Sequence, residues 1–161
     1  MPKDDVLTDL TQARAKLQAA IEGLTPDQML RVGAVGIWSV KDVIAHLTAW
    51  ESELVTTLSH LDQHKRRAPT IVEIEDLDEW NDEQYRVSVA RPIDVVLEDF
   101  QGVHKHLINA IQELDDRTLD NNRMWPWMEG EPLSYLVYEN VIWHEEEHAA
   151  EISEWRENQG S

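Results

Sequence analysis

Apolar residues recur at steps of three and four positions along four long segments of the chain. This spacing returns side chains to one side of an α-helix, so each segment is predicted to form a helix with one apolar face. The apolar positions of the first segment are Val6, Leu10, Ala13, Leu17, Ile21 and Leu24. Those of the second segment are Val40, Val43, Leu47, Trp50, Leu54, Leu58 and Leu61.

The third and fourth segments each open with a proline, a residue favoured in the first turn of a helix. Pro92 opens the third segment and Pro132 opens the fourth. The third stripe consists of Ile93, Leu97, Phe100, His104, Leu107, Ile111 and Leu114. The fourth stripe consists of Leu133, Leu136, Val137, Val141, His144, His148, Ile152 and Trp155. Histidines therefore occupy positions that are predicted to face the interior.

The connections between these segments carry start and stop signals for helices. Ser39 and Asp42 have the spacing of a capping box at the start of the second helix. Basic residues followed by a proline, HKRRAP at residues 64–69, indicate where that helix ends. Residues 69–91 are predicted to cross over irregularly and to include a short helix.

Four amphipathic helices of this length most simply bury their apolar stripes against one another. The sequence therefore predicts an all-α four-helix bundle with a long crossover connection between the second and third long helices. The chain has 161 residues, which suits one domain, and residues 1–161 are expected to form it.

The charge balance is strongly acidic, with 32 Asp and Glu against 14 Lys and Arg and a net charge of -18. Because phosphate groups would be repelled, we expect no nucleic acid and no membrane surface among the partners. The absence of cysteine fits a reducing cytoplasm. The start, MPKDDVLTDL, lacks the layout of a signal peptide, so a cytoplasmic location is expected.

His144 and His148 are four residues apart, so both imidazoles lie on one side of the fourth helix and can reach one metal ion. The plainer interpretation is a pair of core histidines bonded to carboxylates such as Glu147 or Glu151. His46, at the edge of the second helix's stripe, favours the metal. Three histidines from two helices leave coordination positions open, as in a catalytic site.

The stretch WHEEEH at residues 143–148 also matches the zinc-protease pattern H-E-x-x-H. A protease of that kind needs a further ligand, which commonly lies well downstream. The residues after His148, AAEISEWRENQGS, offer only glutamates on or near the same helix. Glu145 should project about 100° away from His144 around the helix. The pattern therefore favours a three-histidine site over a protease.

The segments IWSVKDVIAHLTAWE and WHEEEHAAEISEW, together with EWN at residues 79–81, resemble the DinB-like superfamily of DinB/YfiT-like metalloenzymes. Within it they look most similar to the ClbS/DfsB branch. The resemblance implies a four-helix bundle with a crossed-over connection. It also implies a divalent metal held by three histidines, which map onto His46, His144 and His148.

The same resemblance implies a homodimer, since members of the superfamily are often dimers, and some use small thiols such as mycothiol, bacillithiol or glutathione. The ClbS branch includes a protein that protects its host from a genotoxin. Many members of that branch lack the second histidine of the last helix. This chain keeps it as His148, which moves the interpretation toward the metal-binding relatives.

Two functional hypotheses follow. In the first, the protein is a divalent-metal-dependent enzyme acting on a small molecule, either a hydrolase or a thiol S-transferase. Zinc or nickel is the expected metal, since both accept imidazole ligands. A sulfur nucleophile would come from an external low-molecular-weight thiol, because the chain has no cysteine. In the second, it is a non-catalytic bundle that binds, sequesters or protects against a small molecule.

Further residues are expected to support the histidines or to line a pocket beside them. A nearby carboxylate can orient a ligand histidine or act as a base. His104 is interpreted as a core or supporting histidine, with a fourth ligand as the alternative. The expected supporting and pocket residues are Glu51, Glu147, Trp50 and Asn81.

Overall fold

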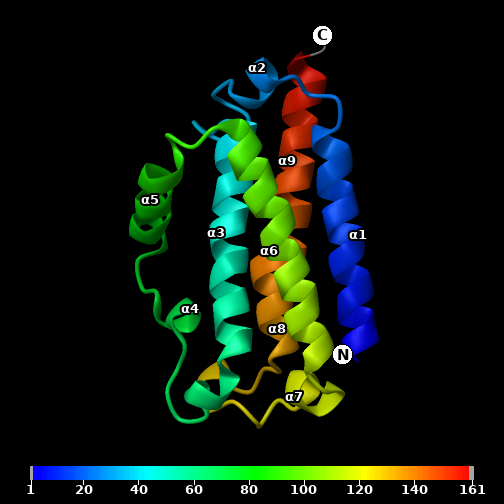
Figure 1. Ribbon diagram of the computed structural model, residues 1–161, viewed down its shortest axis with the longest axis vertical. Coiled ribbons are helices and arrows are strands. Elements are labelled where there is room, and N and C mark those ends of the chain that lie inside the picture. The colour runs from blue at the N-terminus through cyan, green and yellow to red at the C-terminus, as the bar shows by residue number, and fades with distance from the viewer. Residues whose placement is uncertain (1, 160–161) are drawn as a thin grey trace.

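The computed structural model describes residues 2–159, in which four long helices are joined by connections that hold shorter ones (Figure 1). The first three long helices are α1 (Lys3–Ile21), α3 (Val40–Ser59) and α6 (Ile93–Glu113). The fourth is continuous through α8 (Ser134–Val137), the π-helical turn η3 (Tyr138–Ile142) and α9 (Trp143–Gln159). The predicted all-α bundle is confirmed.

The long crossover between the second and third long helices is also confirmed. It contains α4 (Thr70–Glu73) and α5 (Leu77–Ser88), which return the chain from the lower to the upper end of the bundle in Figure 1. As a result α3 and α6 run in the same direction and pack along each other. Helices α1 and α9 form the second such pair.

The remaining connections hold single helical turns. These are α2 (Pro26–Met29), η1 (Leu61–His64), α7 (Asp116–Asp120) and η2 (Pro126–Met128). The predicted capping box starts α3: the Asp42 amide donates to Ser39 Oγ at 3.1 Å, and the Ser39 amide donates to Asp42 Oδ2 at 3.0 Å. This cap satisfies backbone groups at the helix start and fixes the register in which α3 presents His46.

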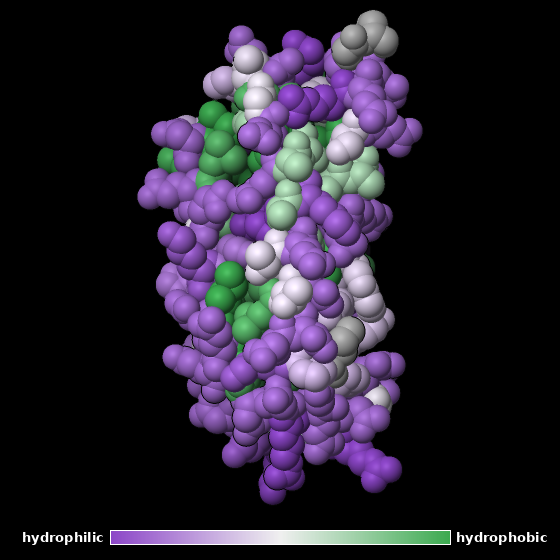
Figure 2. Space-filling model, turned by 90° about the vertical axis from the view of Figure 1, so that its right-hand side faces the viewer, coloured by the Kyte–Doolittle hydropathy of each residue, from purple (hydrophilic) through white to green (hydrophobic). Residues whose placement is uncertain are grey.

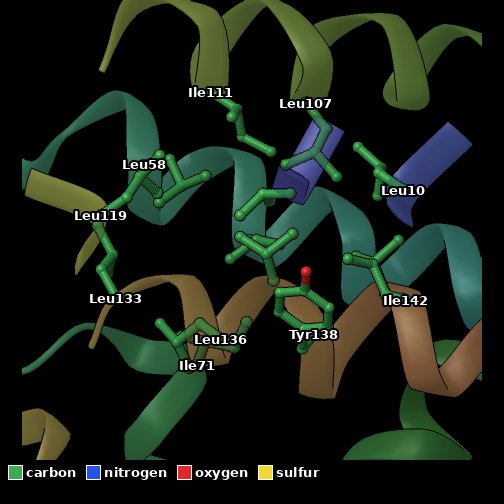
Figure 3. Packing of buried hydrophobic residues seen from close by; sticks show 14 of the residues in the cluster. Leu10, Leu58, Ile71, Leu107, Ile111, Leu119, Leu133, Leu136, Tyr138 and Ile142 are labelled. Atoms are coloured by element: carbon green, nitrogen blue, oxygen red, sulfur yellow. The ribbon is translucent and has the colours of Figure 1, made fainter. Parts of the chain in front are cut away.

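The interior contains two apolar clusters with a polar layer between them. Figure 3 shows one cluster, in which Leu10, Leu58, Leu107 and Ile111 meet the residues around Leu133. The other lies toward the opposite end of the bundle and includes Leu17, Ile44, Phe100 and Ile152. On each long helix a buried polar residue lies where the clusters meet: Arg14, Glu51, His104 and Glu145.

The outer surface is mainly polar. Figure 2 shows the side where α1 lies, and hydrophilic residues cover most of it, with only scattered apolar places between them. Within residues 2–159 no helix combines the length and the hydropathy that a membrane crossing requires. The burial of apolar stripes inside the bundle therefore accounts for most of the hydrophobic pattern in the sequence.

Candidate metal centre

The three predicted ligand histidines come together between α3 and α9. Nε2 of His46 lies 2.9 Å from Nε2 of His144. The ring centres of His144 and His148 are 4.7 Å apart, and those of His46 and His148 are 5.4 Å apart. One nitrogen from each ring lies within 4.8 Å of the others. We call these residues the histidine triad.

The backbone before His144 departs from the regular α-helix. In η3 the Trp143 amide donates to the Tyr138 carbonyl, the wider spacing of a π-helix. Such turns are rare and often lie at functional sites. The Asn140 side chain donates to the Leu136 carbonyl at 2.9 Å, and Nδ1 of His144 lies 3.3 Å from the Asn140 carbonyl oxygen. The turn thus places a backbone acceptor behind His144.

The neighbours of the Nδ1 atoms determine which ring nitrogens are available as ligands. The Asn140 carbonyl accepts only, so Nδ1 of His144 carries the proton and Nε2 keeps its lone pair. Nδ1 of His148 lies 3.1 Å from Glu151 Oε1, near enough for a charge contact but not aligned for a hydrogen bond. That carboxylate likewise favours a proton on Nδ1. Acceptors behind metal-ligating histidines commonly have this effect.

The triad is uncharged at neutral pH. Burial, with smaller effects from the neighbouring His144 and His148, lowers the pKa of His46 to about 3. Burial and His148 lower the pKa of His144 to about 4, although the Asn140 carbonyl and Glu147 act in the opposite direction. Burial also lowers the pKa of His148. No proton has to be displaced from these rings before they can bind a cation.

This donor set fits a divalent transition metal. A tetrahedral ion with Zn–N bonds of about 2.0–2.1 Å holds its nitrogen ligands roughly 3.3 Å apart. The triad brackets that separation, with one pair at 2.9 Å and all within 4.8 Å. Two Nε2 lone pairs at 2.9 Å would repel each other unless a proton or a cation lay between them. His46, His144 and His148 are therefore the residues that would hold the ion.

A pocket of about 830 Å³ opens over the triad, and all three histidines line it. The predicted pocket residues Trp50, Asn81 and Glu147 line it too. Trp50 Nε1 donates to Asn81 Oδ1 at 3.0 Å, which ties α3 to α5. The remaining apolar lining is Trp38, Ile71, Val72, Ile74, Leu77, Trp127 and Leu136. Exposed residues form the rim, so the triad is reached from solvent.

A second group of ionisable side chains lies inside the bundle, beside the triad. Arg14 Nη2 lies 2.9 Å from Glu51 Oε2 and 2.8 Å from Glu145 Oε1. His104 Nδ1 lies 3.0 Å from Glu51 Oε1. The Arg14 guanidinium also sits 3.6 Å above the Phe100 ring centre. We call Arg14, Glu51, His104 and Glu145 the buried network.

The buried network already contains its own cation. Glu51, His104 and Glu145 are near enough to one another to hold a metal, but Arg14 bonds to both carboxylates. Burial raises the pKa of the Glu145 carboxyl, and Arg14 acts against this rise. Glu145 Oε2 is buried and has no hydrogen-bond partner. A buried carboxylate of this kind is costly unless it is paired, so Arg14 is essential to the layer.

The structure places the expected supporting residues in two different surroundings. Glu51 was expected beside the triad, but its hydrogen-bond partners are Arg14 and His104 and it does not line the pocket. His104 is a buried member of the same network, in keeping with its interpretation as a core histidine. Glu147 lies at the pocket rim, and Glu151 stands behind His148.

Sequence reasoning missed Arg14, although the sequence carried a signal for it. Arg14 lies four residues after Leu10 and three before Leu17, a position on the apolar stripe of the first helix. Glu145 follows Val141 by the same helical step. Charged residues on apolar stripes of different helices, with opposite signs, indicate a buried ion pair.

Solved structures with the same fold were found, whereas a comparison with curated protein sequences gives no match. DfsB, described as a sibling lethal factor precursor, has a TM-score of 0.82 and 14% identity, covering 99% of this chain and 97% of its own. An uncharacterised protein from Escherichia coli UTI89 has a TM-score of 0.80 and 17% identity, covering 99% and 95%. At these identities the likeness shows the fold.

The third comparison corrects an expectation. ClbS, a colibactin self-resistance protein solved in complex with a double-stranded DNA, has a TM-score of 0.80 and 12% identity, covering 96% of this chain and 95% of its own. The exclusion of nucleic acid was therefore wrong, because a protein with this fold binds DNA. Net charge is a sum over the chain, whereas phosphate contacts depend on local groups.

The family is identified from the sequence and not from the structural likeness. The family model of the DinB superfamily matches residues 9–152, a range that includes all three histidines of the triad and most of the four long helices. ClbS and DfsB, the relatives that the sequence resemblance indicated, are among the structures with this fold. The chain belongs to the DinB superfamily.

Proposed function

We propose that this protein is a divalent-metal-dependent enzyme acting on a small molecule, a hydrolase or a thiol S-transferase. The observation that carries the proposal is an uncharged histidine triad at an open pocket of about 830 Å³. Three neutral imidazoles contribute no charge of their own. A divalent ion held there keeps its full charge and supplies a Lewis acid on the side that the protein leaves open.

The residues of the chain have distinct tasks in this proposal. His46, His144 and His148 hold the ion, with the Asn140 carbonyl and Glu151 keeping the Nδ1 protons in place. Glu147 lines the pocket and is exposed, so its carboxylate is free to accept a proton from a nucleophile. For thiol transfer the sulfur comes from a separate molecule, because the chain has no cysteine. Zinc and nickel are the metals proposed.

The first experiment is elemental analysis of tag-free protein purified without chelators, alongside His46→Ala and His106→Ala. His106 is exposed and does not line this pocket, so its variant is the matched control. We expect about one equivalent of a divalent transition metal in the parent and the control, and none in His46→Ala. The proposal is overturned if the parent is metal-free and also refuses added zinc and nickel.

Activity is then measured on the metal-loaded and chelator-treated protein, with nitrophenyl esters for hydrolysis and 1-chloro-2,4-dinitrobenzene plus a small thiol for transfer. Turnover that is lost with the metal, and lost in His46→Ala, supports the enzyme. A metal-loaded protein that binds small molecules without multiple turnovers supports the alternative instead, a binding or protective bundle.

The alternative draws its support from the fold shared with ClbS, which is described as a self-resistance protein. Because ClbS was solved with a double-stranded DNA, duplex DNA belongs in the binding tests. Fluorescence anisotropy of a labelled duplex, repeated across salt concentrations, measures that interaction. Binding that weakens steeply with salt would indicate phosphate contacts. The protein is proposed to be a homodimer, which light scattering of the purified chain tests.

A further inference from the structure

The pocket over the histidine triad is lined by acidic side chains and by no lysine or arginine of the described residues. Three carboxylates line it, those of Glu129, Glu139 and Glu147, and all three residues are exposed at its rim. Within these described residues, none of the three carboxylates forms an ion pair with a lysine or an arginine. The mouth of the pocket is therefore a region of uncompensated negative charge.

Glu147 is the rim carboxylate nearest the triad in sequence, since it lies on α9 between His144 and His148. Glu129, which also lines the pocket, has a left-handed backbone with φ of 54°. This conformation is uncommon for a residue other than glycine, and it tends to occur at functional sites.

Three tryptophans, Trp38, Trp50 and Trp127, line the pocket. The Nε1 atom of Trp50 donates to Asn81, and that of Trp127 donates to the His64 carbonyl at 2.8 Å. Because both N–H groups are engaged, these rings offer the pocket apolar surface and π-electrons. Trp38 packs in parallel with Tyr85, at 6.4 Å between ring centres and an angle of 5°. Indole faces attract cations through their quadrupole. The pocket thus combines apolar walls with an acidic mouth.

We propose that the ligand of this pocket is a small molecule with an apolar body and a cationic group, such as a protonated amine. The apolar body fits between the indole faces, and the cationic group lies among the rim carboxylates. A substrate with a carboxylate, phosphate or sulfonate at the same place is disfavoured by repulsion. This inference rests on the proposed function and names its substrate class.

The test uses two probes that share a naphthalene ring and differ in permanent charge, 2-naphthyltrimethylammonium and naphthalene-2-sulfonate. Isothermal titration calorimetry measures the binding of each to the zinc-loaded protein and to the metal-free protein. We expect the cation to bind at least tenfold more tightly than the anion to the metal-free protein, and the preference to be smaller in the zinc-loaded protein, because the ion offsets part of the negative charge. The preference should shrink as salt is added, because exposed charges are screened.

Matched variants distinguish the effect of the rim carboxylates on binding from the effect of the protein's net charge. Glu129→Gln, Glu139→Gln and Glu147→Gln together should reduce the preference at least threefold. The control changes three exposed glutamates that do not line this pocket, Glu22→Gln, Glu113→Gln and Glu157→Gln, and should retain most of it. The inference is overturned if the anion binds as tightly as the cation, if the control loses as much as the rim variant, or if neither probe binds.

The outcome for the metal-free protein does not depend on whether zinc binds. If zinc does not bind and the metal-free protein still prefers the cation, the proposed enzyme fails and the ligand class stands. If zinc binds in the triad and the charge preference is absent from the metal-free protein, the ligand class fails and the proposed enzyme stands.

Discussion

The histidine triad lies on α3 and α9, and the buried network takes one residue from each of the four long helices, yet the two groups treat a cation in opposite ways. In the network, Arg14 lies between the carboxylates of Glu51 and Glu145. In the triad, three imidazoles face one another, and burial together with their proximity lowers the pKa of His46. The network contains a cation of its own, whereas the triad consists of three neutral donors.

The comparison shows that burial and clustering alone do not identify a metal site. Both groups satisfy a distance criterion for metal ligands. The two groups differ in whether they already contain a cationic side chain and in whether solvent can reach them. Arg14 pairs with both carboxylates of the network deep within the bundle, while the triad lines an open pocket. The network is accordingly expected to affect stability, and the triad is expected to affect ligand binding.

The largest predicted effect is on the network. Arg14→Ala leaves two buried carboxylates without their cation and should lower the free energy of unfolding by about 3–5 kcal/mol. Urea denaturation measures it. Lys16→Ala, on the same helix, breaks an exposed ion pair with Glu146 and is the control, with an expected loss under about 1 kcal/mol. A loss for Arg14→Ala as small as the control's would show that the network is not held by Arg14.

The next effect concerns the triad. Zinc at a free concentration about 100-fold above its dissociation constant should stabilise the protein by about 2.7 kcal/mol, because it binds only the folded state. His46→Ala should abolish that gain while the metal-free protein changes little. Thermal denaturation with and without zinc gives both values. Equal stabilisation of parent and variant would place the metal elsewhere, the network included.

The pH dependence of the free energy of unfolding tests whether His46 of the triad is uncharged. The pKa of His46 is lowered from 6.5 to about 3 in the folded protein, so the unfolded chain takes up a proton first as pH falls below 6.5. Folding is therefore opposed by about 1–2 kcal/mol at pH 5, and not at all above pH 7. Urea denaturation of His46→Gln between pH 7.5 and 5 should show a flatter profile than the parent. Parallel profiles would contradict an uncharged His46.

The smallest predicted effect distinguishes the two glutamates of the network. Glu145 has one oxygen without a partner, so Glu145→Gln keeps the Arg14 contact and should change stability by less than about 1 kcal/mol. In Glu51 both oxygens are bonded, to Arg14 and His104, so Glu51→Gln should cost about 2 kcal/mol. Urea denaturation of both variants at pH 7 checks the order, and a reversed order would refute this account.

Several features of the fold could be predicted from local sequence. The four stripes place the long helices, and Ser39 with Asp42 marks the start of α3. Pro92 was predicted to lie in the first turn of α6, and it is the N-cap, one residue before that turn. These signals lie within a few residues of the structure they specify, because helix periodicity and capping are local interactions. The histidine spacing on α9 is local in the same sense.

The functional surroundings of these residues depended on contacts between distant parts of the chain. The sequence determined that His144 and His148 share one face of a helix and that His46 lies at the edge of another stripe. Only the tertiary structure decided that α3 and α9 bring these three rings together while Glu51 turns toward Arg14, 37 residues away. The crossover through α4 and α5 adds the wall that carries Asn81. Helix periodicity fixes the face a side chain occupies, but the direction in which the helices pack decides what that face meets.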